Sequence, residues 1–211
     1  MIKIDPLQKL NLLAESSLAE INVLISQHQS LISQHEITSN LKFIKEHEIH
    51  INVAFELFEL IKPHGNIFEI GPGACYFLYL CKHINNCHID GVDLESPLFS
   101  VIRKQLDIQI NEAHVWAFRN IPFHQPQDYI VTFLTMFNSG WGVNAHKYWL
   151  SDCYNNLNDD GKLFIHFNRR TFHQEIKHIY HSIGKEIREL TFCITKQNLE
   201  EFKECRTQVC P

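Results

Sequence analysis

The stretch "NIFEIGPGACYFLYL", Asn66–Leu80, joins a short apolar run to a helix-like run through two closely spaced glycines. The run "NIFEI" is typical of a buried strand, and the residues after Gly73 are typical of a helix. Between them, Gly71 and Gly73 allow a sharp turn and a close approach of a ligand to the backbone, while Pro72 stiffens the turn. Because the chain has only 8 glycines, we predict that this turn binds a ligand.

The rest of the chain after Asn66 alternates short apolar runs with helix-like segments. The predicted strands are 66–70, 87–93, 128–134, 162–167 and 189–195, and the predicted helices are 73–84, 96–106, 144–157 and 171–184. Ser96 and Pro97 suit the start of a helix, and Asn158–Gly161 suits a turn. This alternation predicts an α/β fold with a doubly wound, mostly parallel sheet.

The first part of the chain has a different pattern, with apolar residues three or four positions apart. Leucines and isoleucines repeat in this way from Leu10 to Ile32, which predicts a helix with a wide apolar face. A second helix is predicted after Thr38 and Ser39, and Pro63 and Gly65 are stop signals. We therefore predict a helical N-terminal extension over residues 1–62 and an α/β domain over residues 63–211.

Two carboxylates indicate the class of ligand. In a doubly wound sheet, ligands bind beyond the carboxyl ends of the strands, where the first strand-to-helix turn lies. A dinucleotide fingerprint would need a third glycine at Tyr76, and the Glu69 carboxylate would repel a diphosphate. Asp93 follows the second strand about 20 residues after the loop, where a carboxylate can accept hydrogen bonds from ribose hydroxyls. This pattern favours a nucleoside without phosphates and disfavours a dinucleotide oxidoreductase.

At these residues the chain resembles the class I S-adenosylmethionine-dependent methyltransferases. The matching segments cover roughly residues 64–195 and are "FEIGPGACYF", "IDGVDLESP", "NIPF", "QDYIVTFLTMFN" and "YNNLNDDGKLFIHFN". The resemblance implies a Rossmann-like methyltransferase fold, S-adenosylmethionine as cofactor, and a small-molecule methyl acceptor. Residues 136–149 are similar to one subgroup of the family, but this similarity does not identify a substrate.

The resemblance also implies a cofactor site. Its residues would be Glu69, Gly71, Gly73, Cys75, Asp93, Leu94, Phe133 and Leu134. Glu69 would lie near the methionine amino group, and the backbone of the two glycines would pack against the methionyl and ribose parts. Asp93 would hold the ribose hydroxyls, with Leu94 beside the adenine. Phe133 and Leu134 would line the pocket.

The chain departs from the family at two positions. Cys75 stands where the family usually has a third glycine, and Ala117 stands about where the family often has an acid that contacts adenine. Trp116 or Phe118 would then cover the adenine. Because of these departures, the alternative to an enzyme is a catalytically degenerate binding or assembly module. The sequence identifies no catalytic residue, although His124, His146 and His166 are candidate general bases and Arg169 or Arg170 could hold an acceptor carboxylate.

Composition limits the partners and the location. The net charge of −5 disfavours a nucleic-acid partner, and the turn that base-methylating relatives carry after the fourth strand is missing. The 7 cysteines form no CxxC pair, so we expect no metal site. We expect no membrane partner and a cytoplasmic protein with reduced thiols.

The wide apolar face of the N-terminal helices predicts that they are buried. The resemblance implies a lid over residues 5–61 that closes the acceptor pocket. The alternative is a homodimer seam.

Overall fold

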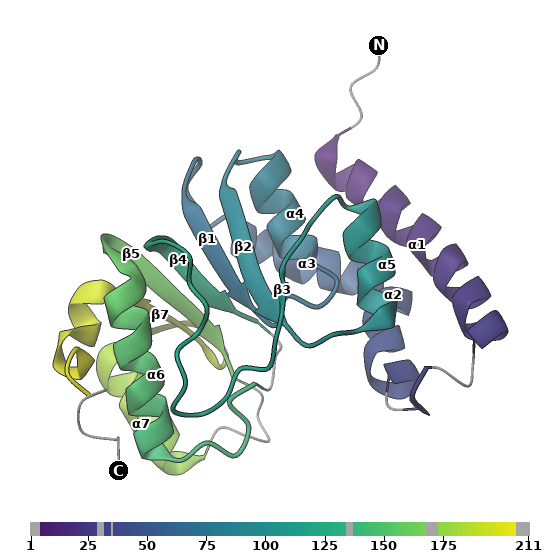
Figure 1. The fold of residues 1–211 in the computed structure, drawn as a ribbon. Coiled ribbons are helices and arrows are strands. Elements are labelled where there is room, and N and C mark those ends of the chain that lie inside the picture. Colours follow the sequence, from purple (N-terminus) through teal and green to yellow (C-terminus); the bar gives the residue numbers. More distant parts are fainter. Residues whose placement is uncertain (1–4, 29–31, 35, 134–136, 168–172, 206–211) are drawn as a thin grey trace.

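The structure, a computed structural model, describes residues 5–28, 32–34, 36–133, 137–167 and 173–205 (Figure 1). Within these residues, a 7-stranded sheet has the order β3-β2-β1-β4-β5-β7-β6. The strands are β1 (Asn66–Ile70), β2 (His88–Asp93), β3 (Asn111–Glu112), β4 (Gln127–Thr132), β5 (Leu157–His166), β6 (Lys185–Arg188) and β7 (Thr191–Thr195). All neighbours from β3 to β5 are parallel, while β7 is antiparallel to both β5 and β6. The predicted doubly wound, mostly parallel sheet is confirmed.

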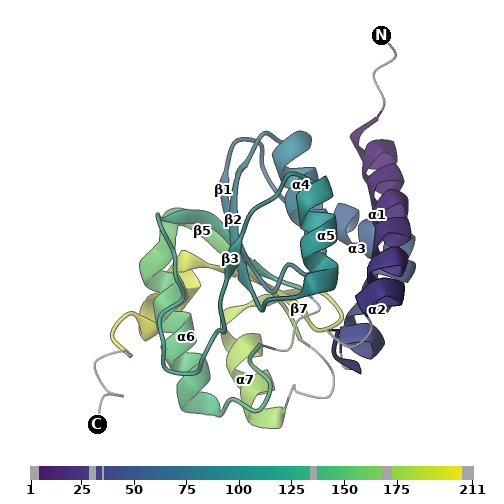
Figure 2. The ribbon, with the colours of Figure 1, turned by 45° about the vertical axis from the view of Figure 1, so that its right-hand side comes forward.

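Helices cover both faces of this sheet (Figures 1 and 2). One layer consists of α1 (Pro6–His28), α2 (Leu41–Lys45), α3 (His47–Phe58), α4 (Tyr76–His83) and α5 (Pro97–Gln105). The other consists of α6 (Val143–Asn156), α7 (Gln174–Ile183) and the 3-10 helix η2 (Lys196–Phe202). Alternate strand residues supply the two cores: Ile67 packs with the first layer and Phe68 with the second. The sheet therefore separates two apolar clusters.

The N-terminal helices complete this first helical layer, with α1 on the side of α4 and α5 that faces away from the sheet (Figures 1 and 2). α1 contacts α4 and α5, and α3 contacts α4. Leu10 and Ile21 from the apolar face of α1 are completely buried in this cluster. Much of the apolar face is therefore covered within the chain, whereas Leu12 and Val23 on the same helix are exposed. The predicted second helix divides at Glu46, whose φ of −99° and ψ of 30° end α2 before α3 begins.

A short part of the extension approaches the start of α5. This part comprises α2 and η1 (Glu36–Asn40), a π-helical turn. Asn40 Nδ2 lies 3.5 Å from Ser96 Oγ, and the Phe43 and Phe99 ring centroids are 6.4 Å apart. Because a Cβ on Gly73 would lie 3.5 Å from the Phe99 ring, Phe99 lies between this segment and the glycine loop.

Most predicted elements after Asn66 are present, with three instructive differences. The predicted turn Asn158–Gly161 lies inside β5, where the pairing with β4 jumps from Gln127–Leu157 to Tyr129–Lys162. These residues therefore form an irregularity within a strand. A Cβ on Gly161 would lie 2.8 Å from the Asn158 carbonyl oxygen, so glycine is needed there. The short strands β3 and β6 and the helix η2 were not predicted.

Candidate functional site

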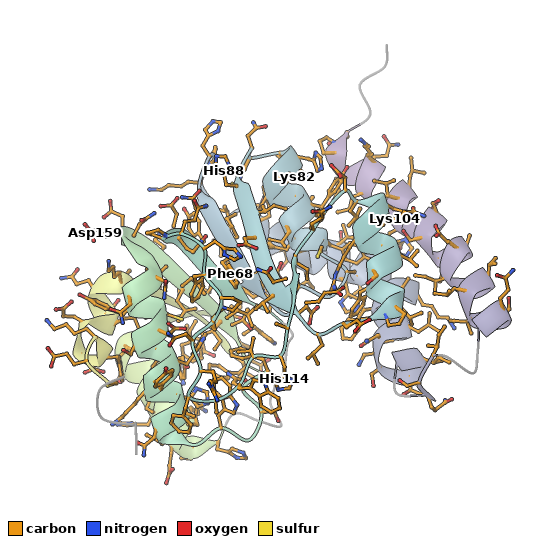
Figure 3. All side chains as sticks on the ribbon, viewed as in Figure 1. Phe68, Lys82, His88, Lys104, His114 and Asp159 are labelled. Atoms are coloured by element: carbon orange, nitrogen blue, oxygen red, sulfur yellow. The ribbon has the colours of Figure 1, made fainter. Side chains whose placement is uncertain are left out.

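The predicted site lies at the edge of the sheet where the parallel strands end. Figure 3 shows His88, at the start of β2, at one edge, and His114, just after β3, at the opposite edge. The glycine loop follows β1, Asp93 ends β2, and Phe133 follows β4. The winding of the sheet reverses next to β1, because β1 pairs with both β2 and β4. The fold thus brings these sequence-predicted residues to the switch point, where doubly wound folds bind ligands.

The glycine loop has the sharp turn that the sequence predicts. Gly71 and Gly73 have φ values of 69° and 54°, in the left-handed region that favours glycine. The Gly71 N–H donates to the Val92 carbonyl at 2.8 Å, and the Cys75 N–H donates to the Pro72 carbonyl at 2.8 Å. The loop therefore closes on itself and is tied to β2.

Cys75 also has a left-handed backbone, with a φ of 61°. This conformation costs a non-glycine residue roughly 1–2 kcal/mol. The side chain is completely buried, and burial raises the pKa of its thiol far above the usual range. Cys75 is therefore a packing residue beneath the loop, and its thiol is not poised as a nucleophile.

Asp93 is more buried than is usual for a residue at the end of a strand, because only 17% of its side chain is exposed. Its Oδ2 accepts hydrogen bonds from the Gly73 N–H at 2.9 Å and from Arg103 Nη2 at 2.6 Å. Its Oδ1 accepts one from the Leu94 N–H at 2.9 Å. Asp93 thus holds the glycine loop in place as well as facing the ligand side of the sheet.

Arg103 is the functional candidate that the sequence analysis missed. Its side chain is only 5% exposed, and its Nε donates to the Gly73 carbonyl at 3.0 Å. The spacing in the sequence could have indicated this. Arg103 lies four residues after Phe99 and three before Leu106, so it shares a helix face with these two buried residues. A charged residue on the buried, apolar face of a helix needs a buried partner of opposite charge. Asp93 is that partner.

Glu69 is buried beneath this network at 4% exposure. Its Oε2 has no hydrogen-bond partner within the described part of the chain. Burial, together with the Asp93 carboxylate, raises the pKa of Glu69 to about 8, against the opposing charge of Arg103. Gly91 lies beside it in β2, and a Cβ there would come within 2.7 Å of the Glu69 carbonyl oxygen. Glu69 is therefore mostly a neutral acid at pH 7 in the ligand-free protein.

The raised pKa of Glu69 predicts that stability falls as pH rises. Its ordinary pKa is 4.5 and its folded value is about 8. Between these values the unfolded chain has released a proton that the folded chain keeps. The free energy of unfolding therefore decreases by up to about 1.4 kcal/mol per pH unit, and this loss ends above pH 8.

Denaturant unfolding at pH 5 and pH 8 checks this prediction. Glu69→Gln should remove this part of the pH dependence, since glutamine does not titrate. The exposed Glu95 provides the control, because Glu95→Gln should keep the wild-type slope. Equal slopes in wild type and Glu69→Gln would show that Glu69 titrates normally.

Three apolar side chains near this edge are exposed to solvent. Leu94 is 54% exposed, Trp116 61% and Phe118 43%. They follow the carboxyl ends of β2 and β3, where the resemblance implies the adenine. Phe133 is buried and packs edge to face on Phe77 of α4, with ring centroids 5.5 Å apart. Leu134 lies outside the described residues, as do Arg169 and Arg170.

A cavity of about 340 Å³ lies further along the same edge. Its lining comes from the β3–β4 connection, the start of α6 and the first turn of α7: Ala117, Phe118, Gly140, Trp141, Gly142, Val143, Asn144, Ala145 and Glu175. The lining is largely apolar, with two aromatic rings and one carboxylate. Ala117, predicted to replace an adenine-binding acid, contributes to this cavity.

The candidate general bases are held by structural contacts. His146 is buried and lies 3.0 Å from the Tyr180 hydroxyl, and burial lowers its pKa to about 4. The His166 Nδ1 lies 2.8 Å from Thr191 Oγ1, and His124 lies 3.0 Å from the Asn111 side chain. Among the described residues, no group of three or more His, Cys, Asp or Glu side chains could hold a metal ion.

No family model matches the sequence, and no curated protein does either. Solved structures do match. DesVI of Streptomyces venezuelae has 12% identity and a TM-score of 0.52, over 67% of this chain and 61% of DesVI. A putative class I S-adenosylmethionine-dependent methyltransferase from Listeria monocytogenes has 14% identity and a TM-score of 0.50, over 86% of this chain and 68% of the other.

A third match has higher identity. A putative S-adenosyl-L-methionine-dependent methyltransferase from Methanococcus maripaludis has 18% identity and a TM-score of 0.50, over 70% of this chain and 84% of the other. The chain has the fold of class I S-adenosylmethionine-dependent methyltransferases. At these identities the match concerns the methyltransferase fold alone, and the chain spans less than two thirds of DesVI.

The methyltransferase fold confirms the fold expected from the resemblance. The sequence-predicted residues Glu69, Gly71, Gly73, Cys75 and Asp93 all surround its first strand-to-helix turn. In the described part of the chain, every helix is too short or too polar to cross a membrane. The cysteines described, 75, 81, 87, 153, 193 and 205, are free thiols.

Proposed function

We propose that this protein binds S-adenosylmethionine and transfers its methyl group to a small-molecule acceptor. One observation carries the proposal: the buried Glu69, at the end of β1, has a carboxyl oxygen without a hydrogen-bond partner among the described residues. A buried polar atom left unpaired is costly, so a ligand that supplies a donor there is favoured. The ammonium group of S-adenosylmethionine is such a donor, whereas a diphosphate brings only acceptors to Glu69 and would be repelled by the Asp93 carboxylate.

The residues around Glu69 fit the remainder of this cofactor. Asp93 ends β2 with a carboxylate that can accept from a ribose hydroxyl. The exposed Leu94 and Trp116 offer apolar surface that an adenine ring would cover. Gly73 leaves its backbone open to close approach, since among the described residues a Cβ there would meet only the Phe99 ring, at 3.5 Å.

The chemistry requires little from the protein's side chains. The cofactor, when bound, supplies an electrophilic methyl group on a sulfonium. The protein aligns an acceptor with that methyl group and excludes water. The cavity of about 340 Å³ beside Trp141 has the size and apolar lining typical of small-molecule sites. We assign the acceptor to this cavity.

Calorimetry with S-adenosylmethionine and with NAD tests the cofactor. We expect binding of S-adenosylmethionine and none of NAD. Binding should release close to one proton per site at pH 7, because a ligand ammonium beside Glu69 would lower its pKa of about 8. Titrations in two buffers of different ionisation enthalpy measure this release. Binding of NAD alone would reject the proposal.

A second candidate is a degenerate methyltransferase fold that acts as a binding or assembly module. The close pairing of Asp93 with Arg103 favours it, because this pair already uses part of the carboxylate that would hold ribose. A turnover assay over a panel of amine, hydroxyl and thiol acceptors separates the two candidates. Release of S-adenosylhomocysteine with any acceptor supports the enzyme.

The proposal also gives the N-terminal extension a role, as a lid over the acceptor pocket. The lid over residues 5–61 stays a proposal, and the contacts of Asn40 with Ser96 and of Phe43 with Phe99 support a role for Glu36–Lys45 in it. A homodimer seam and a cytoplasmic location stay predictions from the sequence.

A further inference from the structure

We propose that Arg103 is a positioning residue that shapes the nucleoside site so that Asp93 holds a single ribose hydroxyl. This inference rests on the proposed function, since it concerns how the same site binds its nucleoside. The observation behind it is that one buried guanidinium bonds both the glycine loop and the carboxylate at the end of β2.

The contacts of Arg103 place it at the centre of the site. Its Nε donates to the Gly73 carbonyl at 3.0 Å, and its Nη2 donates to Asp93 Oδ2 at 2.6 Å. Its Nη1 lies 3.6 Å from Oε1 of Glu112, the β3 residue that pairs with Asp93. The guanidinium carbon lies 5.7 Å from the centre of the Phe99 ring on the same helix. These contacts fix the side chain in one orientation.

The bonds of Asp93 determine what remains for a ligand. A carboxylate has about four lone-pair sites. Three are used in the protein: two on Oδ2, by Gly73 and Arg103, and one on Oδ1, by the Leu94 N–H. One site on Oδ1 is left. A ribose diol would need two acceptor sites to donate from both hydroxyls, so Asp93 can hold only one of them.

The same contacts fix the loop before any ligand binds. Asp93 accepts a hydrogen bond from the Gly73 N–H, and Arg103 donates one to the Gly73 carbonyl. Both backbone polar groups of Gly73 are therefore fixed. The loop is therefore preorganised, which lowers the entropic cost of binding. An arginine suits this position because its planar fork donates in two fixed directions, whereas the lysine ammonium acts as a compact point charge.

Calorimetry with S-adenosylhomocysteine and its 2′-deoxy and 3′-deoxy analogues tests the inference on the full chain. In the wild type, we expect one deoxy analogue to bind about tenfold more weakly, as for one lost hydrogen bond to a charged group. The other analogue should lose less than about twofold, because its missing hydroxyl has no site on Asp93.

Two variants then separate a positioning role from general stability. Arg103→Lys keeps a positive charge in the site, but a lysine that donates to the Gly73 carbonyl cannot also donate to Asp93 Oδ2. The link between the loop and Asp93 is then lost, so S-adenosylhomocysteine should bind about tenfold more weakly. Both deoxy analogues should then show similar penalties, because an Oδ2 site becomes free. Arg103→Met should give the same change in pattern, and Arg103→Lys keeps the test valid if the methionine variant does not fold. The control is Arg188→Lys, at an exposed arginine paired with Glu56, which should match the wild type.

The outcomes are distinguishable. Equal penalties for the two analogues in the wild type, or unchanged affinities in Arg103→Lys, would overturn this inference while leaving the cofactor assignment intact. Failure of the wild type to bind S-adenosylhomocysteine would reject the proposed function and this inference with it.

Discussion

Replacing Gly73 with valine is expected to abolish S-adenosylmethionine binding. The φ of Gly73 is 54°, a conformation that a β-branched residue adopts only at a cost of about 1–3 kcal/mol. The space for one Cβ is adequate, so strain is the main effect. A change of φ would break the hydrogen bonds from Gly73 to Asp93 and Arg103. We expect a loss of affinity of more than about a hundredfold, measured by calorimetry.

Asn86 provides a matched control for Gly73. It also has a positive φ, of 52°, and it is exposed just before β2 begins, at the edge of the sheet opposite the glycine loop. Asn86→Val therefore imposes comparable backbone strain away from the glycine loop and should leave S-adenosylmethionine affinity within about twofold of the wild type. If Gly73→Val also bound with wild-type affinity, the loop would be an ordinary turn and the nucleoside site would lie elsewhere.

Replacing Asp93 with alanine is expected to reduce both binding and stability. An acid at the end of a strand is ordinarily exposed, and its loss then has little effect on stability. The structure shows instead that Asp93 neutralises Arg103, whose side chain is 5% exposed. Removing one partner of a buried ion pair typically costs about 3–5 kcal/mol, because the other charge stays buried. Denaturant unfolding and calorimetry measure the two losses separately.

Asp159→Ala is the matched control for this variant. Asp159 pairs with Lys196 at 3.2 Å, but its side chain is fully exposed, so its loss should hardly change stability. Asp93→Asn should lie between the wild type and Asp93→Ala, since the amide oxygen can still accept one hydrogen bond. An Asp93→Ala variant as stable as the wild type would show that Arg103 finds another partner or reaches water.

The sequence was sufficient where local patterns determine structure. The strand at 66–70, the cap at Ser96 and the left-handed glycines follow from apolar runs and backbone preferences. The carboxyl ends of parallel strands then had to meet at one edge, which brought Glu69, Gly73 and Asp93 together.

Other features depend on contacts between distant segments. The two-residue β3 and the four-residue β6 are too short to show a period, and pairing with a neighbouring strand defines them. The ion pair of Arg103 with Asp93 joins α5 to β2, and no local pattern specifies that the two side chains meet. The positive φ of Cys75 is likewise imposed by the closed loop, against the residue's own preference.

The burial of α1 against α4 and α5 has a consequence for how the molecule folds. Leu10, Ala14 and Ile21 share one core with Leu98 and Ile102 of α5, and α5 is the helix that carries Arg103. A chain shortened to begin near Lys62 would expose that core to water and favour aggregation. We therefore expect the N-terminal helices and the α/β sheet to unfold as one cooperative unit, which should melt in a single transition and protect its amides from hydrogen exchange together.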